Sequence, residues 1–182
     1  MKKAILVLSL AAVSAVSFAQ KKLVTTSATV SFDATTKLDA LPKADNKAVT
    51  ASLNTKSGDV AFEAVVKNFS FSNPKIQEHF NGAQWMDSDK YPTASFKGKI
   101  TNLAAVKFGT DGTYEATVEG ELTMHGVTQK VSAPATITVA GKAVSAKSDF
   151  SVKVADYNVN GPAIGAGKVA TDPKITVLAD FK

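Results

Sequence analysis

The sequence predicts an all-β fold, an antiparallel eight-stranded barrel with a short helical excursion between strands. Apolar and polar residues alternate over most of the chain, which is the pattern of half-buried strands. Turn-forming residues separate many of these stretches at hairpin spacing. The chain has no cysteine, so its stability must come from an ordinary core and a closed hydrogen-bond network.

Residues 1–19 are predicted to be a signal peptide. A basic start precedes an apolar stretch, residues 4–16, of the length found in signal peptides and too short to span a membrane. Small residues at the end of this region predict cleavage after Ala19. We therefore expect an exported protein, periplasmic or secreted, with a single folded domain over residues 20–182.

The charge pattern argues against a nucleic-acid partner. The formal net charge is +5, but the chain has no arginine and its lysines are spread along the sequence. Nucleic-acid-binding surfaces usually cluster their basic residues. We expect the lysines to lie on a solvated outer face, with transient attraction to anionic membrane head groups as the alternative. The sequence does not indicate an oligomeric state.

The strand pattern is clearest in residues 114–122, where apolar residues alternate with glutamate and threonine. Because successive side chains of a strand point to opposite faces, this segment must be buried on one face only. The same pattern recurs along the chain. In order, the predicted strands are residues 30–32, 49–53, 60–66, 94–100, 114–122, 131–139, 144–154 and 175–181.

Short turns around Gly58, Gly112, Gly126 and Gly141 separate strand candidates, and such links join antiparallel neighbours. Residues 72–92 lack alternation, and we expect one or two helical turns there, around residues 76–80. A second irregular loop is predicted at residues 161–167, which are rich in glycine.

Closing eight strands into a barrel removes the exposed sheet edges. A barrel of this size holds either its own side chains or one small ligand. Many small residues on the apolar face favour a cavity, although Phe62, Phe96 and Phe150 could interdigitate with them and fill the interior. The small residues are Ala64, Ala116, Gly120, Ala133, Ala135, Ala146 and Ala179.

Three segments resemble the YceI-like family. Residues 122–128, Leu-Thr-Met-His-Gly-Val-Thr, are similar to a hairpin of that family. Residues 85–92 with Phe96 resemble its segment between barrel strands, and residues 155–159 resemble a third stretch. The resemblance implies an exported, lipocalin-like barrel that binds polyisoprenoids or similar long-chain lipids.

The chain departs from the family pattern in its basic residues. Many members carry arginines near the segment corresponding to residues 76–80 and near the position of Lys153, but this chain has none. Lysine does not reproduce the bidentate contacts of arginine. A head-group role for those arginines is therefore not carried over to this chain.

No catalytic or metal-binding constellation is evident. The two histidines, His79 and His125, lie in no recognisable catalytic motif, and the cysteines and spacings of common metal sites are missing. We expect His125 to be a turn residue and His79 to cap or pack the excursion. No cofactor is implied, and a hydrolase or metal enzyme is the least favoured class.

The sequence therefore favours a lipid-binding protein that sequesters or carries a long-chain apolar molecule, by resemblance a polyisoprenoid or quinone-like lipid. Trp85 and Tyr91 are candidates for a lid. The alternative is a structural or protein-interaction module with a filled barrel, which would act through Trp85 and residues 72–92. The predicted ligand-binding residues are Phe62, Val66, Phe96, Tyr114, Val118, Ile137 and Phe150.

Overall fold

A computed structural model describes residues 22–181. The predicted signal peptide, residues 1–19, lies outside this part of the chain and stays a prediction. Within residues 22–181, no helix is long and apolar enough to cross a membrane. The strands are β1 (Lys22–Asp33), β2 (Lys43–Asn54), β3 (Asp59–Val65), β4 (Ser70–Phe71), β5 (Thr93–Ile100), β6 (Gly112–Met124), β7 (Val127–Ala140), β8 (Ala143–Ser151) and β9 (Lys174–Phe181). The helices are α1 (Pro74–Asn81), α2 (Pro162–Gly165) and the 3₁₀ turns η1 (Val66–Asn68), η2 (Leu103–Ala105) and η3 (Val154–Tyr157).

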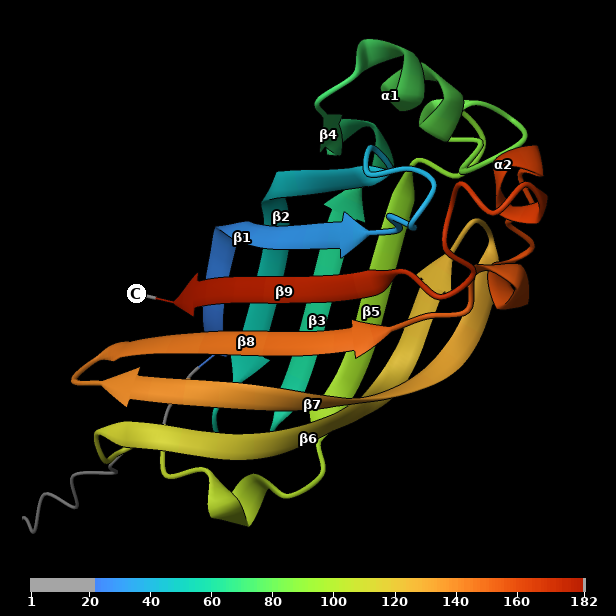
Figure 1. Ribbon diagram of the computed structural model, residues 1–182. Helices are drawn as coiled ribbons and strands as arrows, with labels where there is room; N and C mark the ends of the chain where they lie inside the picture. The colour runs from blue at the N-terminus through green and yellow to red at the C-terminus, as the bar shows by residue number, and fades with distance from the viewer. Residues whose placement is uncertain (1–21, 182) are drawn as a thin grey trace, which may run out of the picture.

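Eight strands close into one antiparallel barrel (Figure 1). They follow the order β1-β9-β8-β7-β6-β5-β3-β2 around the barrel, and β2 pairs again with β1. The two-residue strand β4 pairs with one end of β2. Each predicted strand segment corresponds to one barrel strand, so the fold class expected from the alternation is confirmed.

Helix α1 forms where the alternation stops. Pro74 takes the first helical position, where its missing N–H costs no hydrogen bond. The side chain of Asn73 caps the helix and accepts a hydrogen bond from the Lys75 amide at 2.9 Å. The helical excursion expected around residues 76–80 is therefore confirmed.

Two strands end earlier than expected. β8 ends at Ser151, because the Val154 amide then donates to the Thr171 carbonyl at 3.1 Å and η3 begins. β3 ends at Val65, and Val66 starts η1. In both places apolar alternation continues into residues that are no longer part of the strand, so the period alone overestimates the strand length.

β1 is longer than expected, because shifts in its register hide the alternation. Its pairing with β2 slips between Thr25 and Ala28, and again between Ala28 and Val30. Such irregularities move side chains from one face to the other. The loop expected at residues 161–167 contains one helical turn, α2, with Pro162 at its start.

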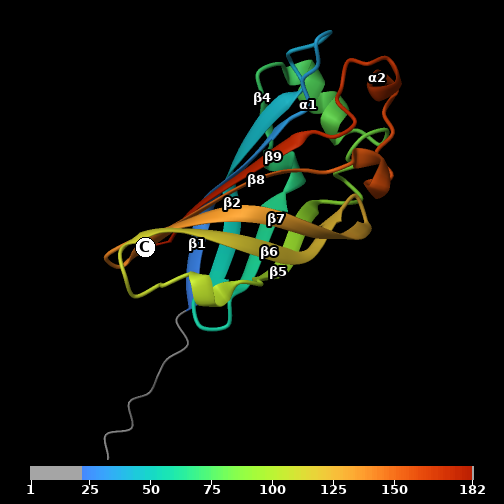
Figure 2. The same ribbon diagram turned by 60° about the horizontal axis from the view of Figure 1, so that its bottom comes forward.

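The two ends of the barrel differ in their connections (Figure 2). Short turns and the η2 loop lie at one end, whereas α1 and α2 gather at the other. The turn end comprises residues 55–58, 101–111 and 141–142, and the loop end comprises residues 34–42, 66–92, 125–126 and 152–173.

Candidate functional site

A cavity of about 890 Å³ lies inside the barrel and extends to the loop end. Its volume falls within the range of small-molecule pockets, roughly 300–1,000 Å³. Inward-facing side chains of the strands form most of its wall, and residues of α1, α2 and the 34–42 loop complete it. The wall is predominantly apolar. An apolar molecule would therefore be desolvated on entering it.

Large side chains close the cavity toward the turn end. Leu53, Ile100 and Phe181 are each 2% exposed and form its floor. The packed core continues from the floor to Val139 and Val144, next to the β7–β8 turn. The barrel is therefore filled at the turn end and hollow toward the loop end, so both interiors considered from the sequence occur in one molecule.

Small side chains leave space in the hollow part. Four of the small residues predicted on the inner face line the cavity, namely Ala64, Ala133, Ala135 and Ala146. Ala116 and Ala179 are buried in the adjoining core. Because an alanine fills only a small volume, the strands that carry these residues leave a lumen between them.

The Phe96 ring lies along the barrel wall. Gly98 of β5 pairs with Gly120 of β6, and neither has a side chain to occupy the inner face. A Cβ atom at Gly98 would lie 2.6 Å from Phe96 Cζ, and one at Gly120 would lie 2.7 Å from the same atom. Both distances are too short for carbon atoms. The glycine pair therefore forms the recess that holds this ring against the wall.

Four phenylalanines form a roof at the loop end. Phe80 of α1 lies 5.4 Å from Phe32, 5.8 Å from Phe69 and 5.0 Å from Phe71, measured between ring centroids. These separations are typical of favourable aromatic pairs. All four residues line the cavity. The helical excursion is thus fixed to the barrel by the same side chains that cover the lumen.

Trp85 also lies on the cavity wall, next to the connection between β8 and β9. Its indole ring packs directly on Gly161 and leaves no room there for a Cβ atom. Tyr91, the other lid candidate, lies away from the cavity wall. Its ring packs edge-on against His125 at 4.8 Å between centroids. The same ring lies so close to Gly126 that a Cβ atom there would be 2.5 Å from Tyr91 Cε1.

Most side chains predicted to bind a ligand face the cavity. Val66 does not, because η1 places it in a second core beside the cavity. Tyr114 also lies outside the wall, and its hydroxyl donates to the Thr110 carbonyl at 2.8 Å near the turn end. The predicted residues on the wall are Phe62, Phe96, Val118, Ile137 and Phe150.

His125 and Gly126 form the turn of the β6–β7 hairpin. Their φ angles are 51° and 74°, as required at both central positions of a type I′ turn. The Nδ1 atom of His125 hydrogen-bonds the Tyr157 carbonyl at 3.0 Å. Burial raises the pKa of the Tyr157 phenol, with a further contribution from Asp156. The turn role predicted for His125 is confirmed.

Charged groups reach the cavity mainly at its rim. Asp39, Glu78, His79 and Lys168 line it on the loop side. Among residues 22–181, no group of three or more His, Cys, Asp or Glu side chains could hold a metal ion. His79 lies exposed in the last turn of α1, where its backbone carbonyl accepts a hydrogen bond from the Gly82 amide at 3.0 Å. The capping or packing role expected for its side chain stays a prediction.

The sequence profile of the YceI-like domain matches residues 10–181. The chain belongs to the YceI-like family. No curated protein sequence matches it.

Solved structures share the YceI-like fold. A polyisoprenoid-binding domain from Saccharophagus degradans, implicated in plant cell wall breakdown, has a TM-score of 0.74 and 10% identity, covering 88% of this chain and 97% of its own. BcnA from Burkholderia cenocepacia has a TM-score of 0.68 and 20% identity, with coverages of 83% and 94%. The YCEI protein of Campylobacter jejuni has a TM-score of 0.53 and 16% identity, covering 74% of this chain and 80% of its own. At these identities the likeness establishes the fold alone.

The residues that suggested the YceI-like family contact one another where the helical excursion meets the β6–β7 hairpin. The hairpin motif, residues 122–128, contacts the other motif, residues 85–92, through Tyr91 and His125. The carbonyl of Pro92 accepts a hydrogen bond from the Val66 amide at 2.8 Å. These motifs therefore connect the excursion to the barrel wall.

The sequence interpretation missed the phenylalanine roof. Phe69, Phe71 and Phe80 were available as a signal, since three aromatic residues occur close together in and beside a segment without strand alternation. Their rings come together only because α1 folds over the end of the barrel. Phe32 completes the group from β1.

Proposed function

We propose that this protein is exported and sequesters or carries a long-chain apolar molecule in its barrel, with a polyisoprenoid or a quinone-like lipid as the candidate class. The apolar cavity of about 890 Å³ is the observation that carries the proposal. The Saccharophagus degradans neighbour, described as polyisoprenoid-binding, supports the class of ligand. The signal-peptide pattern supports periplasmic or secreted localisation.

The cavity size sets a capacity for such a ligand. A water molecule occupies about 30 Å³ in the liquid, so about 890 Å³ holds about 30 groups of that size. Methylene groups are similar in size, which gives about 30 carbon atoms, or about six isoprene units. Each buried CH₂ contributes about 0.8 kcal/mol before ordering costs are subtracted. The affinity can therefore arise without a charged anchor.

The polar end of such a ligand would lie at the loop end. Glu78, His79 and Lys168 supply hydrogen-bonding groups at the rim, whereas the floor is apolar. Most of the wall below the rim is apolar, and this arrangement favours binding of a long apolar chain.

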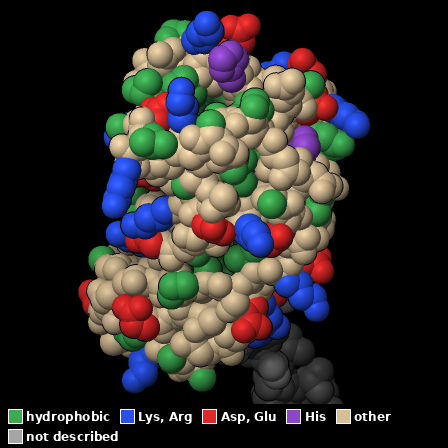
Figure 3. Space-filling view, turned by 45° about the vertical axis from the view of Figure 1, so that its right-hand side comes forward, with side chains coloured by type: hydrophobic (Ala, Val, Ile, Leu, Met, Phe, Trp, Pro, Cys, Tyr) green, Lys and Arg blue, Asp and Glu red, His purple; other side chains and the backbone are tan. Residues whose placement is uncertain are grey.

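Two exposed leucines support transient contact of the loop end with a membrane surface. Leu38 is 73% exposed and Leu41 is 44% exposed, and the exposed Lys37 and Lys43 flank them. On the face shown in Figure 3, hydrophobic side chains are scattered among polar and charged ones. The protein-interaction alternative is weakened by the cavity, since it supposes a filled barrel.

Lipid extraction and mass spectrometry of protein purified from its native host test the proposal. Ala135→Phe adds a ring to the cavity wall, whereas the neighbouring Thr136→Phe points away from the lumen. We expect an apolar lipid in the wild type and in Thr136→Phe, and at least a several-fold loss in Ala135→Phe. Equal lipid content in the two variants, or no lipid in the wild type, would overturn the proposed function.

A further inference from the structure

The barrel wall has a seam where β7 separates from β8. The two strands pair from the hairpin pair Ala140–Ala143 to Ala135–Ser148 and no further. β7 continues back to Val127 paired with β6, while β8 continues to Ser151 paired with β9. Figure 1 shows the two strands diverging toward the loop end.

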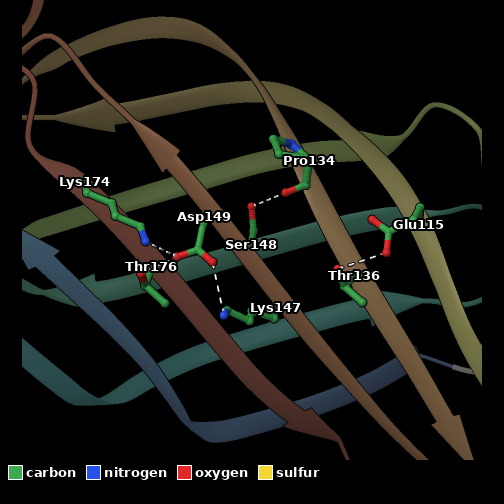
Figure 4. Close-up of polar contacts among 8 residues, drawn as sticks. All are labelled: Glu115, Pro134, Thr136, Lys147, Ser148, Asp149, Lys174 and Thr176. Carbon is green, nitrogen blue, oxygen red and sulfur yellow. Dashed lines mark hydrogen bonds and ion pairs between the residues drawn. The ribbon is translucent and has the colours of Figure 1, made fainter.

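Pro134 explains why the ladder stops. In a two-residue hairpin the closing pair is hydrogen-bonded, so alternate residues back from Ala140, including Pro134, direct their backbone groups toward β8. Proline has no N–H to donate, and a ladder cannot continue normally through it. The Ser148 hydroxyl donates to the Pro134 carbonyl at 2.6 Å and marks the end of the paired region (Figure 4).

Side chains hold the far end of the seam. The Nδ1 atom of His125 bonds the Tyr157 carbonyl, and Gln129 Nε2 donates to the Asp156 carbonyl at 2.9 Å. Both acceptors belong to η3. The β6–β7 hairpin is therefore tied to the connection after β8 by side chains, and not by a continuous backbone ladder.

The seam has two sides, here called banks, formed by β7 and β8. β8 is the bank that is held in place by its other neighbour, β9. Asp149 forms ion pairs with Lys147 at 3.2 Å and with Lys174 of β9 at 3.3 Å (Figure 4). Thr176 of β9 donates to the same carboxylate at 2.6 Å. The contacts of Asp149 with Lys174 and Thr176 join β8 to β9, whereas the β6–β7 hairpin meets this side of the seam only through side chains.

The cavity reaches both banks. Val131 and Ala133 line it from β7, and Phe150 and Val152 line it from β8 and the residue that follows. All four side chains are apolar. The seam therefore combines an apolar inner surface with the absence of a β7–β8 ladder beyond Ser148 in the described structure.

We propose that this seam is a second opening of the cavity, through which the end of a linear apolar chain too long for the cavity passes. The inference rests on the lipid-binding function proposed above. The floor residues Leu53, Ile100 and Phe181 block extension toward the turn end. Parting the seam would separate apolar side chains of the second core and break the hydrogen bonds of His125 and Gln129, but no β7–β8 backbone ladder. The ligand class thus extends to linear chains of more than about 30 carbons.

Crosslinking the seam tests this inference. The chain has no cysteine, so a short bifunctional thiol reagent would join only introduced residues. Ser132→Cys with Ser151→Cys places exposed thiols on opposite banks. The matched control, Thr138→Cys with Ser145→Cys, joins positions that already pair. The probes are two prenyl alcohols, one filling about half the cavity and one about twice its capacity, with binding followed by emission of Trp85, the only tryptophan.

We expect the seam crosslink to weaken binding of the long alcohol at least tenfold and to leave the short alcohol unchanged. The control crosslink should affect neither alcohol. Unchanged binding of the long alcohol, or equal loss of both, would overturn the seam as the outlet while retaining lipid binding. If the uncrosslinked wild type binds neither alcohol, the proposed function fails and the seam proposal fails with it.

Discussion

The filled and hollow ends of the barrel are built from the same strands by the same alternation. Toward the turn end, the inward side chains include Leu53, Ile100 and Phe181, which pack against one another. Toward the loop end, alanines line the lumen, and the Gly98–Gly120 pair makes room for the Phe96 ring against the wall. The comparison shows that alternation specifies a wall, whereas side-chain volume specifies whether that wall encloses a core or a cavity.

The two ends should therefore respond differently to loss of a large side chain. Phe181→Ala removes a fully packed ring and should lower the free energy of unfolding by about 3–5 kcal/mol. Phe150→Ala removes a half-buried ring that already faces the cavity, and about 1 kcal/mol is expected because fewer contacts are lost. Urea unfolding of both variants measures the contrast. Equal losses would show that the two ends are packed alike.

The glycine recess should be the most sensitive part of the hollow end. A Cβ atom at Gly120 would clash with the Lys97 carbonyl oxygen, and it would lie 2.5 Å from Gly98 Cα and 2.7 Å from Phe96 Cζ. Gly120→Ala should therefore cost at least about 1–3 kcal/mol through overpacking. Gly165→Ala is the matched control, since no atom lies within 4 Å of the added Cβ position. Thermal unfolding of the two variants checks this prediction. A Gly120→Ala protein as stable as the control would contradict the close approach of β5 and Phe96 to this position.

The contacts of Asp149, which hold β8 beside β9, should contribute least to the free energy of unfolding. A hydrogen bond from Thr176, with the ammonium groups of Lys147 and Lys174, holds the pKa of Asp149 below its ordinary value. A lowered folded-state pKa stabilises the protein above the ordinary aspartate pKa, and this stability disappears as the pH falls through the folded value. Asp149→Asn should cost less than about 1 kcal/mol at neutral pH.

Denaturant titrations of wild type and Asp149→Asn, from neutral pH down to a pH below the folded-state pKa of Asp149, would measure this difference in stability. The two proteins should converge in acid. A difference that grew as the pH fell would contradict the assigned sign.

Much of the fold could be predicted because strand alternation is local. The backbone sends successive side chains to opposite faces, so residues 114–122 indicate a wall without knowledge of their partners. The His125–Gly126 turn is equally local, since its φ angles depend on two residues. β1 was harder to read because its register shifts depend on pairing with β2.

The candidate site was predictable only in part. Phe62, Phe96 and Phe150 share the inner face as expected, but Val66 follows η1 out of the wall and Tyr114 lies toward the filled end. Alternation gives the face of a residue and does not give its height in the barrel. The height depends on strand tilt and register, which are set by pairing along the whole sheet.

The sequence by itself determined an all-β chain, its turns, the helical excursion and an inner face rich in small residues, because these follow from neighbouring residues. The tertiary structure decided where large and small side chains meet across the lumen, and therefore which end is hollow. The tertiary structure also decided the effect of Pro134. Its missing N–H interrupts the β7–β8 ladder because its backbone faces β8, where an N–H would otherwise donate a hydrogen bond. Packing and pairing across the barrel are long-range properties, and closure alone brings those residues together.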